Sequence, residues 1–259
     1  MLFRSAVGSM SVPFVDVIYA TVVSMIVVQL TRLAQVNALD QTRDTLGNGI
    51  RLVAIVCLPL FVLLEIIAGE VIVLLYTSRF VDAVPVFRVS LLLLPLIATQ
   101  LECVPRAYGD TRFLFFMCAV RGVVCVGLLA VLPAAFGLAG APLAFVLALV
   151  ASHVLLLVRV SRLTGLGYAK VWPLGVLGRI VAASLVSAIP VLVMKGTGLL
   201  ALGPALGAAG LAFGATYIVT LWRFGVLRSG EKAAVRTLGR RLGALVGVLG
   251  REAVEGRPR

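Results

Sequence analysis

Several ionisable side chains lie within or at the ends of long apolar stretches of this 259-residue chain, and five of them are candidates for a site: Asp16, Glu65, Glu102, Arg106 and Arg121. A charged side chain at the centre of a bilayer costs about 2.5–3.5 kcal/mol on insertion scales. Such residues therefore pair with one another or face a water-filled cavity. Arginine also presents a planar fork of donors that matches carboxylates and phosphates. These residue types predict ion pairing, or the binding of a charged group, inside a membrane.

Arg121 and Glu65 are the two most costly of these charges, because both are predicted well inside apolar segments. Arg121 can pair with Glu65 or Glu102 on a neighbouring helix, or it can bind an anionic substrate group such as a phosphate. Glu102 and Arg106 are four residues apart, which also fits an ion pair near the membrane surface. Asp16, close to the end of its segment, also fits a carboxylate solvated by water.

The composition requires several membrane-spanning helices to hold these charges. Hydrophobic residues make up 61% of the chain and charged residues 13%, against about 45–50% and about 25% in soluble domains. A lipid-exposed backbone must satisfy its hydrogen bonds internally, so we predict an all-α, polytopic membrane helix bundle. About seven segments reach the length of about 20 apolar residues that a span needs: 11–33, 52–76, 84–105, 113–136, 138–158, 174–194 and 199–224.

Proline, glycine and basic residues predict how the segments are connected and oriented. The stretch Leu132–Pro142 is rich in Pro and Gly and predicts a tight turn between the fourth and fifth segments. Most of the 23 Lys and Arg fall in the first, third and fifth loops and in the tail. Basic loops stay in the cytoplasm, so we expect a multi-pass plasma-membrane protein with a cytoplasmic carboxy terminus. We prefer this explanation of the +12 net charge to nucleic-acid binding.

The sequence carries no familiar catalytic or metal-binding motif. It has no GxSxG, HExxH or Walker A pattern, one histidine (His153), and four cysteines without a CxxC pair. We therefore expect neither an enzyme nor a bound metal or cofactor. His153 is expected to form a packing hydrogen bond between helices rather than to carry protons.

Several quoted segments, taken in order, resemble a known family. They are VPFVDVIYATVVSMIVVQLTRLAQ, LPLFVLLEIIAGEVIVLLYTSRF, AVPVFRVSLLLLPL, RAYGDTRF and GLAGAPLAFVLA. Together they resemble the carboxy-terminal half of the multidrug/oligosaccharidyl-lipid/polysaccharide exporter superfamily, especially bacterial oligosaccharide and lipid II flippases. Thr77 and Ser78 stand where that family often has glycine, and Glu65 stands where it is usually apolar.

The resemblance implies a division of the chain into three parts. Residues 1–163 would form the carboxy-terminal lobe of a MATE-like flippase core, 164–228 an extra helix pair, and 229–259 a basic cytoplasmic tail. The tail, with helical spacing of apolar residues over 231–249, is also predicted to form an amphipathic helix on the inner leaflet or a solvated segment. A start just before a span predicts a fragment that lacks an amino-terminal lobe, or a shortened homologue that assembles with a separate one.

The function implied by the resemblance is translocation of polyprenyl-phosphate-linked oligosaccharide across the plasma membrane by alternating access. The expected partners are membrane lipid, that lipid-linked sugar and the missing lobe. Arg121 would neutralise the substrate phosphate, with Glu65 or Glu102 as its resting counter-ion. Two alternatives stay open: a cation-coupled multidrug exporter that uses Asp16 or Glu65 as its proton or Na⁺ site, and a non-transporting assembly subunit of a cell-envelope synthase.

Overall fold

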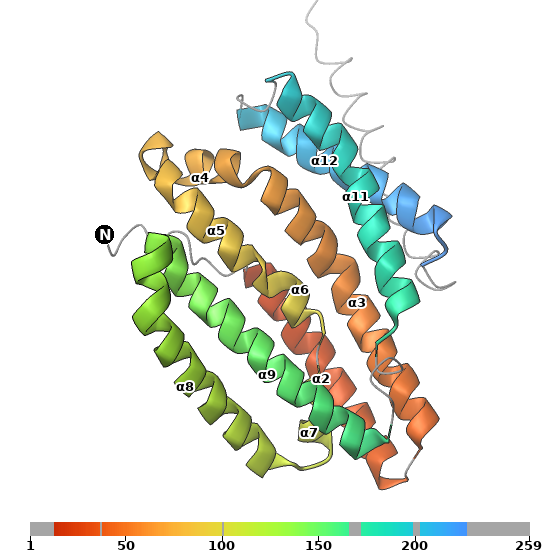
Figure 1. Ribbon diagram of the computed structural model, residues 1–259. Coiled ribbons are helices and arrows are strands. Elements are labelled where there is room, and N and C mark those ends of the chain that lie inside the picture. Colours follow the sequence, from red (N-terminus) through yellow and green to blue (C-terminus); the bar gives the residue numbers. More distant parts are fainter. Residues whose placement is uncertain (1–12, 37, 100, 166–171, 199–202, 227–259) are drawn as a thin grey trace, which may run out of the picture.

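The computed structural model describes residues 13–36, 38–99, 101–165, 172–198 and 203–226, and every regular element in these ranges is helical (Figure 1). By length and composition, five segments in these ranges can cross a membrane: Leu39–Ile66, Ser78–Ile97, Thr111–Thr164, Leu174–Gly196 and Ala205–Arg223. The prediction of an all-helical, multi-pass membrane protein is confirmed at this level. The predicted tail, 229–259, lies outside the described residues.

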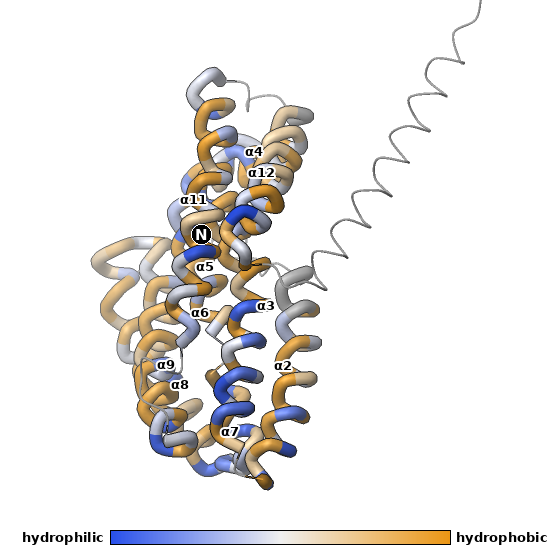
Figure 2. Tube along the Cα trace, turned by 90° about the vertical axis from the view of Figure 1, so that its right-hand side faces the viewer, coloured by the Kyte–Doolittle hydropathy of each residue, from blue (hydrophilic) through white to orange (hydrophobic). Residues whose placement is uncertain are grey.

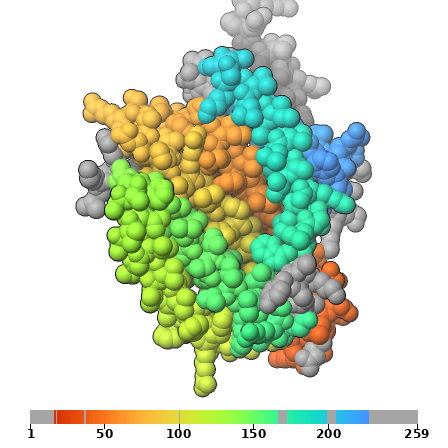
Figure 3. All heavy atoms as spheres, viewed as in Figure 1, coloured from red at the N-terminus to blue at the C-terminus, as the bar shows by residue number. Residues whose placement is uncertain are grey.

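The helices form one bundle around a central long helix. In chain order they are α2 (Pro13–Gln35), α3 (Leu39–Ile66), α4 (Ala68–Tyr76), the 3₁₀ helix η1 (Ser78–Ala83), α5 (Val84–Leu91), α6 (Leu93–Ile97), α7 (Cys103–Ala107), α8 (Thr111–Phe136), the 3₁₀ helix η2 (Gly137–Ala139), α9 (Gly140–Thr164), α11 (Leu174–Gly196) and α12 (Gly203–Arg223). α3 packs against both α2 and α11, α8 packs on α9, and α11 packs on α12. Figure 3 shows α8–α9 in green and α11 in teal on either side of α3–α6.

The turn predicted within Leu132–Pro142 is confirmed. α8 ends at Phe136, η2 follows, and α9 begins at Gly140, so the 54-residue apolar segment folds back on itself as a hairpin. Gly140 is buried at the start of α9, against the last turns of α8. A Cβ atom at this position would lie 2.5 Å from both the carbonyl carbon and the carbonyl oxygen of Leu132. The hairpin therefore closes over a backbone contact that only glycine leaves room for.

The first predicted loop is wrong, because most of it is helix. α3 begins at Leu39 rather than near residue 52, so Arg43 and Arg51 lie in a helix. Hydropathy detects where a segment is apolar, whereas the helix continues beyond its apolar part. Figure 2 shows this polar first half of α3 as a run of hydrophilic residues.

Basic residues nevertheless gather at one end of the bundle. The ends of α2 and α9 and the starts of α3 and α8 all lie at the lower end in Figure 1. These helix ends carry many of the arginines predicted for the first, third and fifth loops, including Arg32, Arg43, Arg112 and Arg162. Basic residues are therefore concentrated at one end of the bundle, although they lie near the ends of helices rather than in loops.

The third predicted span, 84–105, is not continuous but breaks into α5, α6 and α7. Proline has no N–H, and its ring clashes with the carbonyl group four residues earlier. Pro95 therefore ends α5 at Leu91, and Pro105 prevents the helix from continuing through Leu101. The Thr99 hydroxyl donates to the Leu96 carbonyl at 2.8 Å, which satisfies one of the backbone acceptors at the break.

The second predicted span, 52–76, is also bent, between α3 and α4. α3 ends at Ile66, and Ile67 joins it to α4 with a backbone conformation outside the helical region. Lys195 of α11 reaches this bend, where its Nζ donates to the Ile66 carbonyl and lies 3.0 Å from Glu70 Oε1. The bend is therefore held from a neighbouring helix.

α12 is fastened to α3 by hydrogen bonds at two positions. The Tyr217 hydroxyl donates to the Ile55 carbonyl at 2.9 Å. At its end α12 closes in a Schellman turn, with Gly225 at φ +64° and the Val226 N–H donating to the Leu221 carbonyl. Arg51 Nη1 then donates to the Val226 carbonyl at 2.7 Å. The basic residue that had been expected in a loop thus anchors the end of the last described helix.

Thr77, between α4 and η1, is the single non-glycine residue with positive φ in the described ranges. Its angles, φ +79° and ψ +164°, fall in a region that is essentially restricted to glycine and costs about 1–3 kcal/mol for other residues. We therefore expect Thr77→Gly to raise stability by about 1 kcal/mol, after the extra unfolded-state entropy of glycine is subtracted. The shift in melting temperature of the protein in detergent measures this gain.

Thr197→Gly is the matched control for that variant, because Thr197 also follows a helix but has ordinary angles, φ −85° and ψ −1°. Glycine there relieves nothing and adds unfolded-state entropy, so the melting temperature is expected to fall. If both substitutions lower the melting temperature, then Thr77 is not strained.

Candidate functional site

The helices line a half-open cavity of about 220 Å³ near the break between α6 and α7. Four polar side chains line it, and they come from four different parts of the chain: Tyr19, Glu102, Arg121 and His153. The remaining lining is apolar: Leu93, Leu96, Ile97, Leu101, Phe145 and Leu149. The cavity therefore has a small charged part within a largely hydrocarbon wall.

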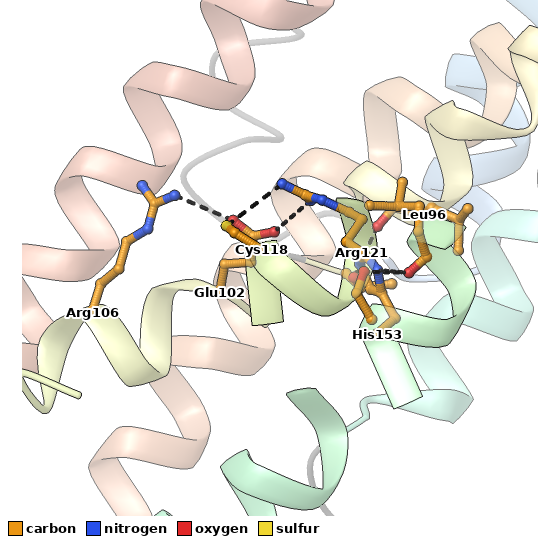
Figure 4. A network of polar contacts seen from close by, with 9 residues as sticks. Leu96, Glu102, Arg106, Cys118, Arg121 and His153 are labelled. Carbon is orange, nitrogen blue, oxygen red and sulfur yellow. Dashed lines mark hydrogen bonds and ion pairs between the residues drawn. The ribbon is translucent and has the colours of Figure 1, made fainter. Parts of the chain in front are cut away.

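Glu102 lies between two arginines (Figure 4). Arg121 Nη1 is 3.6 Å from Glu102 Oε1, and Arg106 Nη2 donates to Glu102 Oε2 at 3.2 Å. The side chains of Glu102 and Arg121 are 21% and 29% exposed, whereas that of Arg106 is 52% exposed. Two guanidinium groups and one carboxylate leave this cluster with an excess of one positive charge.

The local sequence explains how the cluster is assembled. Glu102 directly precedes α7, where the helix restarts because of Pro105. Arg121 lies one turn after Met117, which is among the few fully buried side chains of α8, so both are on its inner face. Arg121 Nη2 also lies 3.8 Å from Cys118 Sγ. The broken span thus presents a carboxylate to the inward face of the hairpin.

His153 lines the same cavity from α9. Its Nδ1 lies 2.9 Å from the Leu149 carbonyl, one turn earlier in the same helix. The hydrogen bond is therefore within α9 and not between helices, which differs from the expected packing role. The ring adds a second type of polar group beside Arg121 in the cavity.

The structure brings together three of the five predicted site residues and places a fourth elsewhere. Glu102, Arg106 and Arg121 form the cluster, so Glu102 and not Glu65 is the partner of Arg121. Glu65 Oε1 lies 3.7 Å from Arg88 Nε of α5, with both side chains partly exposed. Asp16 is in the first turns of α2, and its side chain lies outside the described part of the chain.

Two features of this region were not expected from the sequence. Tyr19 lines the cavity although it looks like any other aromatic residue of an apolar helix. Arg159 Nε lies 2.7 Å from Asp110 Oδ2, and its guanidinium lies over the ring of Phe113 at 5.5 Å. An Asp directly before a helix is typical of a capping residue, but the Asp110 side chain forms no capping hydrogen bond. Its pairing with an arginine 49 positions away had no signal in the local sequence.

The chemistry available in the cavity is recognition of an anion that carries an apolar group. Arginine binds phosphate and carboxylate oxygens through paired N–H donors, and the low polarity of the wall strengthens such contacts. Within the described ranges, no group of three His, Cys, Asp or Glu side chains is placed to hold a metal ion. The cysteines there are single thiols, of which Cys57 and Cys103 are buried.

The chain matches no protein-family model and no curated protein.

Proposed function

We propose that this chain is a membrane transport protein of the flippase type, which moves a lipid-linked oligosaccharide precursor across the plasma membrane. The observation that carries the proposal is the positively charged cluster of Glu102, Arg106 and Arg121 beside an apolar cavity within a helical bundle. Arginines in such surroundings are suited to the phosphate of a polyprenyl-phosphate carrier. The resemblance of the sequence to oligosaccharide and lipid II flippases agrees with this chemistry.

In this proposal the described helices form one lobe of a two-lobed transporter. Five segments can cross the membrane by length and composition, and one of them contains both α8 and α9. If α8 and α9 each cross once and α2 crosses as well, the chain would make the seven crossings expected from the sequence. α11 and α12 would be the extra pair. The partner lobe would complete the passage for the sugar, and the basic end of the bundle would face the cytoplasm.

The size of the cavity bears on which part of the ligand it would hold. A half-open cavity of about 220 Å³ has room for a phosphate group and the first carbons of its lipid, and its open side leaves the rest of a larger ligand outside. The cavity would therefore hold the junction between phosphate and lipid, while the sugar lies outside it.

The break between α6 and α7 supplies the movable element. Transporters commonly build their binding sites around discontinuous helices near the middle of the membrane. Here the break between α6 and α7 lies beside Glu102 and is enforced by Pro105. A change of angle at this break would move Glu102 relative to Arg121, which is held on the continuous helix α8.

Binding of polyprenyl phosphate to the purified chain in a non-ionic detergent tests the proposal, with the uncharged polyprenol as comparison. We expect the phosphate to bind more tightly, and Arg121→Ala to weaken it at least about tenfold, since a hydrogen bond to a charged group contributes about 1.5–3 kcal/mol. Arg112→Ala is the control, because Arg112 is an exposed arginine in the first turn of the same helix. Isothermal titration calorimetry measures the binding.

Two results would contradict the proposal. Equal binding of polyprenol and polyprenyl phosphate would show that the arginines recognise no phosphate. Equal affinities for Arg121→Ala and the unaltered protein would show that the cavity is not the site. Flipping of a fluorescent lipid-linked sugar in vesicles of the native membrane, which would also hold the partner lobe, extends the test from binding to transport when the unaltered protein and Arg121→Ala are compared.

A further inference from the structure

The position of Glu102 has a consequence for which anions the cavity can admit. Its carboxylate lies between the two guanidinium groups and contacts both. An anionic ligand that pairs with the same side of the Arg121 guanidinium therefore competes with this carboxylate. Either the ligand displaces Glu102 from Arg121, or the two anions lie side by side in a site of low polarity, which is strongly unfavourable.

Glu102 competes as a tethered ligand. Because it is part of the chain, its effective concentration at Arg121 is on the order of millimolar or more, without any loss of translational freedom on binding. A ligand that offers only a single carboxylate forms the same kind of contact as Glu102. Such a ligand gains nothing by the exchange and has to bind from dilute solution.

A phosphate monoester carries more charge than its competitor. Near pH 7 it has a charge of about −1.5 to −2 and three strong acceptor oxygens. The cluster contains two guanidinium groups, Arg106 and Arg121, so a doubly charged headgroup can neutralise both once Glu102 has moved away. The position of Glu102 beside the Pro105 break, outside the continuous helices, leaves it a route to do so.

We propose that Glu102 is a specificity-determining residue, an internal competitor that makes the cavity select doubly charged phosphate headgroups over singly charged anions. This inference rests on the proposed anion-binding function of the cavity. It also requires a diphosphate linkage in the lipid-linked sugar, because a single phosphate esterified to both lipid and sugar carries only one negative charge. It adds that the carboxylate weakens the binding of all anions and weakens that of singly charged anions the most.

Two amphiphiles with the same alkyl chain test the selectivity: dodecyl phosphate, doubly charged at pH 8, and dodecanoate, singly charged. Their affinities for the purified chain are compared in a non-ionic detergent. For the unaltered protein we expect dodecyl phosphate to bind about tenfold more tightly than dodecanoate, a ratio equivalent to about 1.4 kcal/mol. In Glu102→Gln, dodecanoate is expected to bind about tenfold more tightly than before, so that the preference largely disappears.

Glu65→Gln is the matched control, because Glu65 is a carboxylate of a membrane helix that pairs with Arg88 and does not line the cavity. Its affinities and its preference are expected to be unchanged. Glu102→Asp provides a second variant in case Glu102→Gln does not fold. Its carboxylate is withdrawn by one methylene group, so dodecanoate is expected to bind more tightly than to the unaltered protein, though less tightly than to Glu102→Gln.

The possible failures can be told apart. If the unaltered protein binds dodecyl phosphate but Glu102→Gln keeps the full preference, then Glu102 is only a structural ion-pair partner and this inference is overturned. A loss of affinity for both amphiphiles at a constant ratio has the same meaning. If the unaltered protein binds neither amphiphile, then the proposed anion-binding function itself is wrong.

Discussion

Gly140→Ala is expected to destabilise the protein by about 3 kcal/mol, at the upper end of the usual cost of overpacking. The reason is that the added Cβ would lie 2.5 Å from backbone atoms of Leu132, and a backbone cannot rotate away as a side chain can. The α8–α9 hairpin would have to open at its turn. Since α8 carries Arg121 and α9 carries His153, the cavity would change with it.

Gly127→Ala tests whether the effect comes from this contact rather than from the loss of a glycine. Gly127 lies within α8, and a Cβ there would meet no atom within 4 Å. Alanine has the higher helix propensity, so this variant is expected to gain up to about 1 kcal/mol. The two variants should therefore shift the melting temperature in detergent in opposite directions. A Gly140→Ala protein as stable as the parent would show that the helices do not approach this closely.

Arg51→Ala is expected to release the end of α12 from α3, at a cost of about 2–3 kcal/mol, as for the loss of a buried hydrogen bond to a charged group. Arg51 is only 6% exposed, and its Nη1 donates to the Val226 carbonyl at 2.7 Å. Truncation would leave that carbonyl group buried without this donor and would remove the packing of a long side chain.

Amide hydrogen exchange distinguishes local release from general destabilisation. In Arg51→Ala, protection is expected to fall mainly in α12, while α8 and α9, which are packed on each other, keep theirs. Arg43→Ala is the comparison, because Arg43 is an exposed arginine two turns earlier in the same helix. Unchanged exchange in α12 after Arg51→Ala would mean that other contacts, such as that of Tyr217 with Ile55, suffice to hold it.

The features that depend on local sequence were predictable. The turn between α8 and α9 follows from Pro and Gly within an otherwise uninterrupted apolar stretch, and α11 begins at Leu174, where the sixth span was expected. The break in the third span was only partly predictable. Pro95 and Pro105 indicate kinks, but whether a proline kinks or ends a helix depends on what packs around it, and this information is not local.

The features that depend on contacts between distant segments were not predictable. Arg121 had two candidate partners, Glu65 and Glu102, and depth in the membrane alone did not separate them. The structure separates them because Glu65 pairs with Arg88 on α5. In the same way, Arg51 looked like a solvated loop residue, because its acceptor at Val226 lies 175 positions away.

The contact of Lys195 with the bend at Ile66 also bears on how the protein is made. The two residues are separated by 129 positions, and ribosomes add about 5–20 residues per second, so Lys195 is synthesised roughly 6–26 s after Ile66. During this interval the bend between α3 and α4 exists without the ammonium group that holds it. The final shape of an early span is thus completed only by the arrival of a late one, and a nascent chain that stops before α11 leaves Glu70 and the Ile66 carbonyl without that ammonium group.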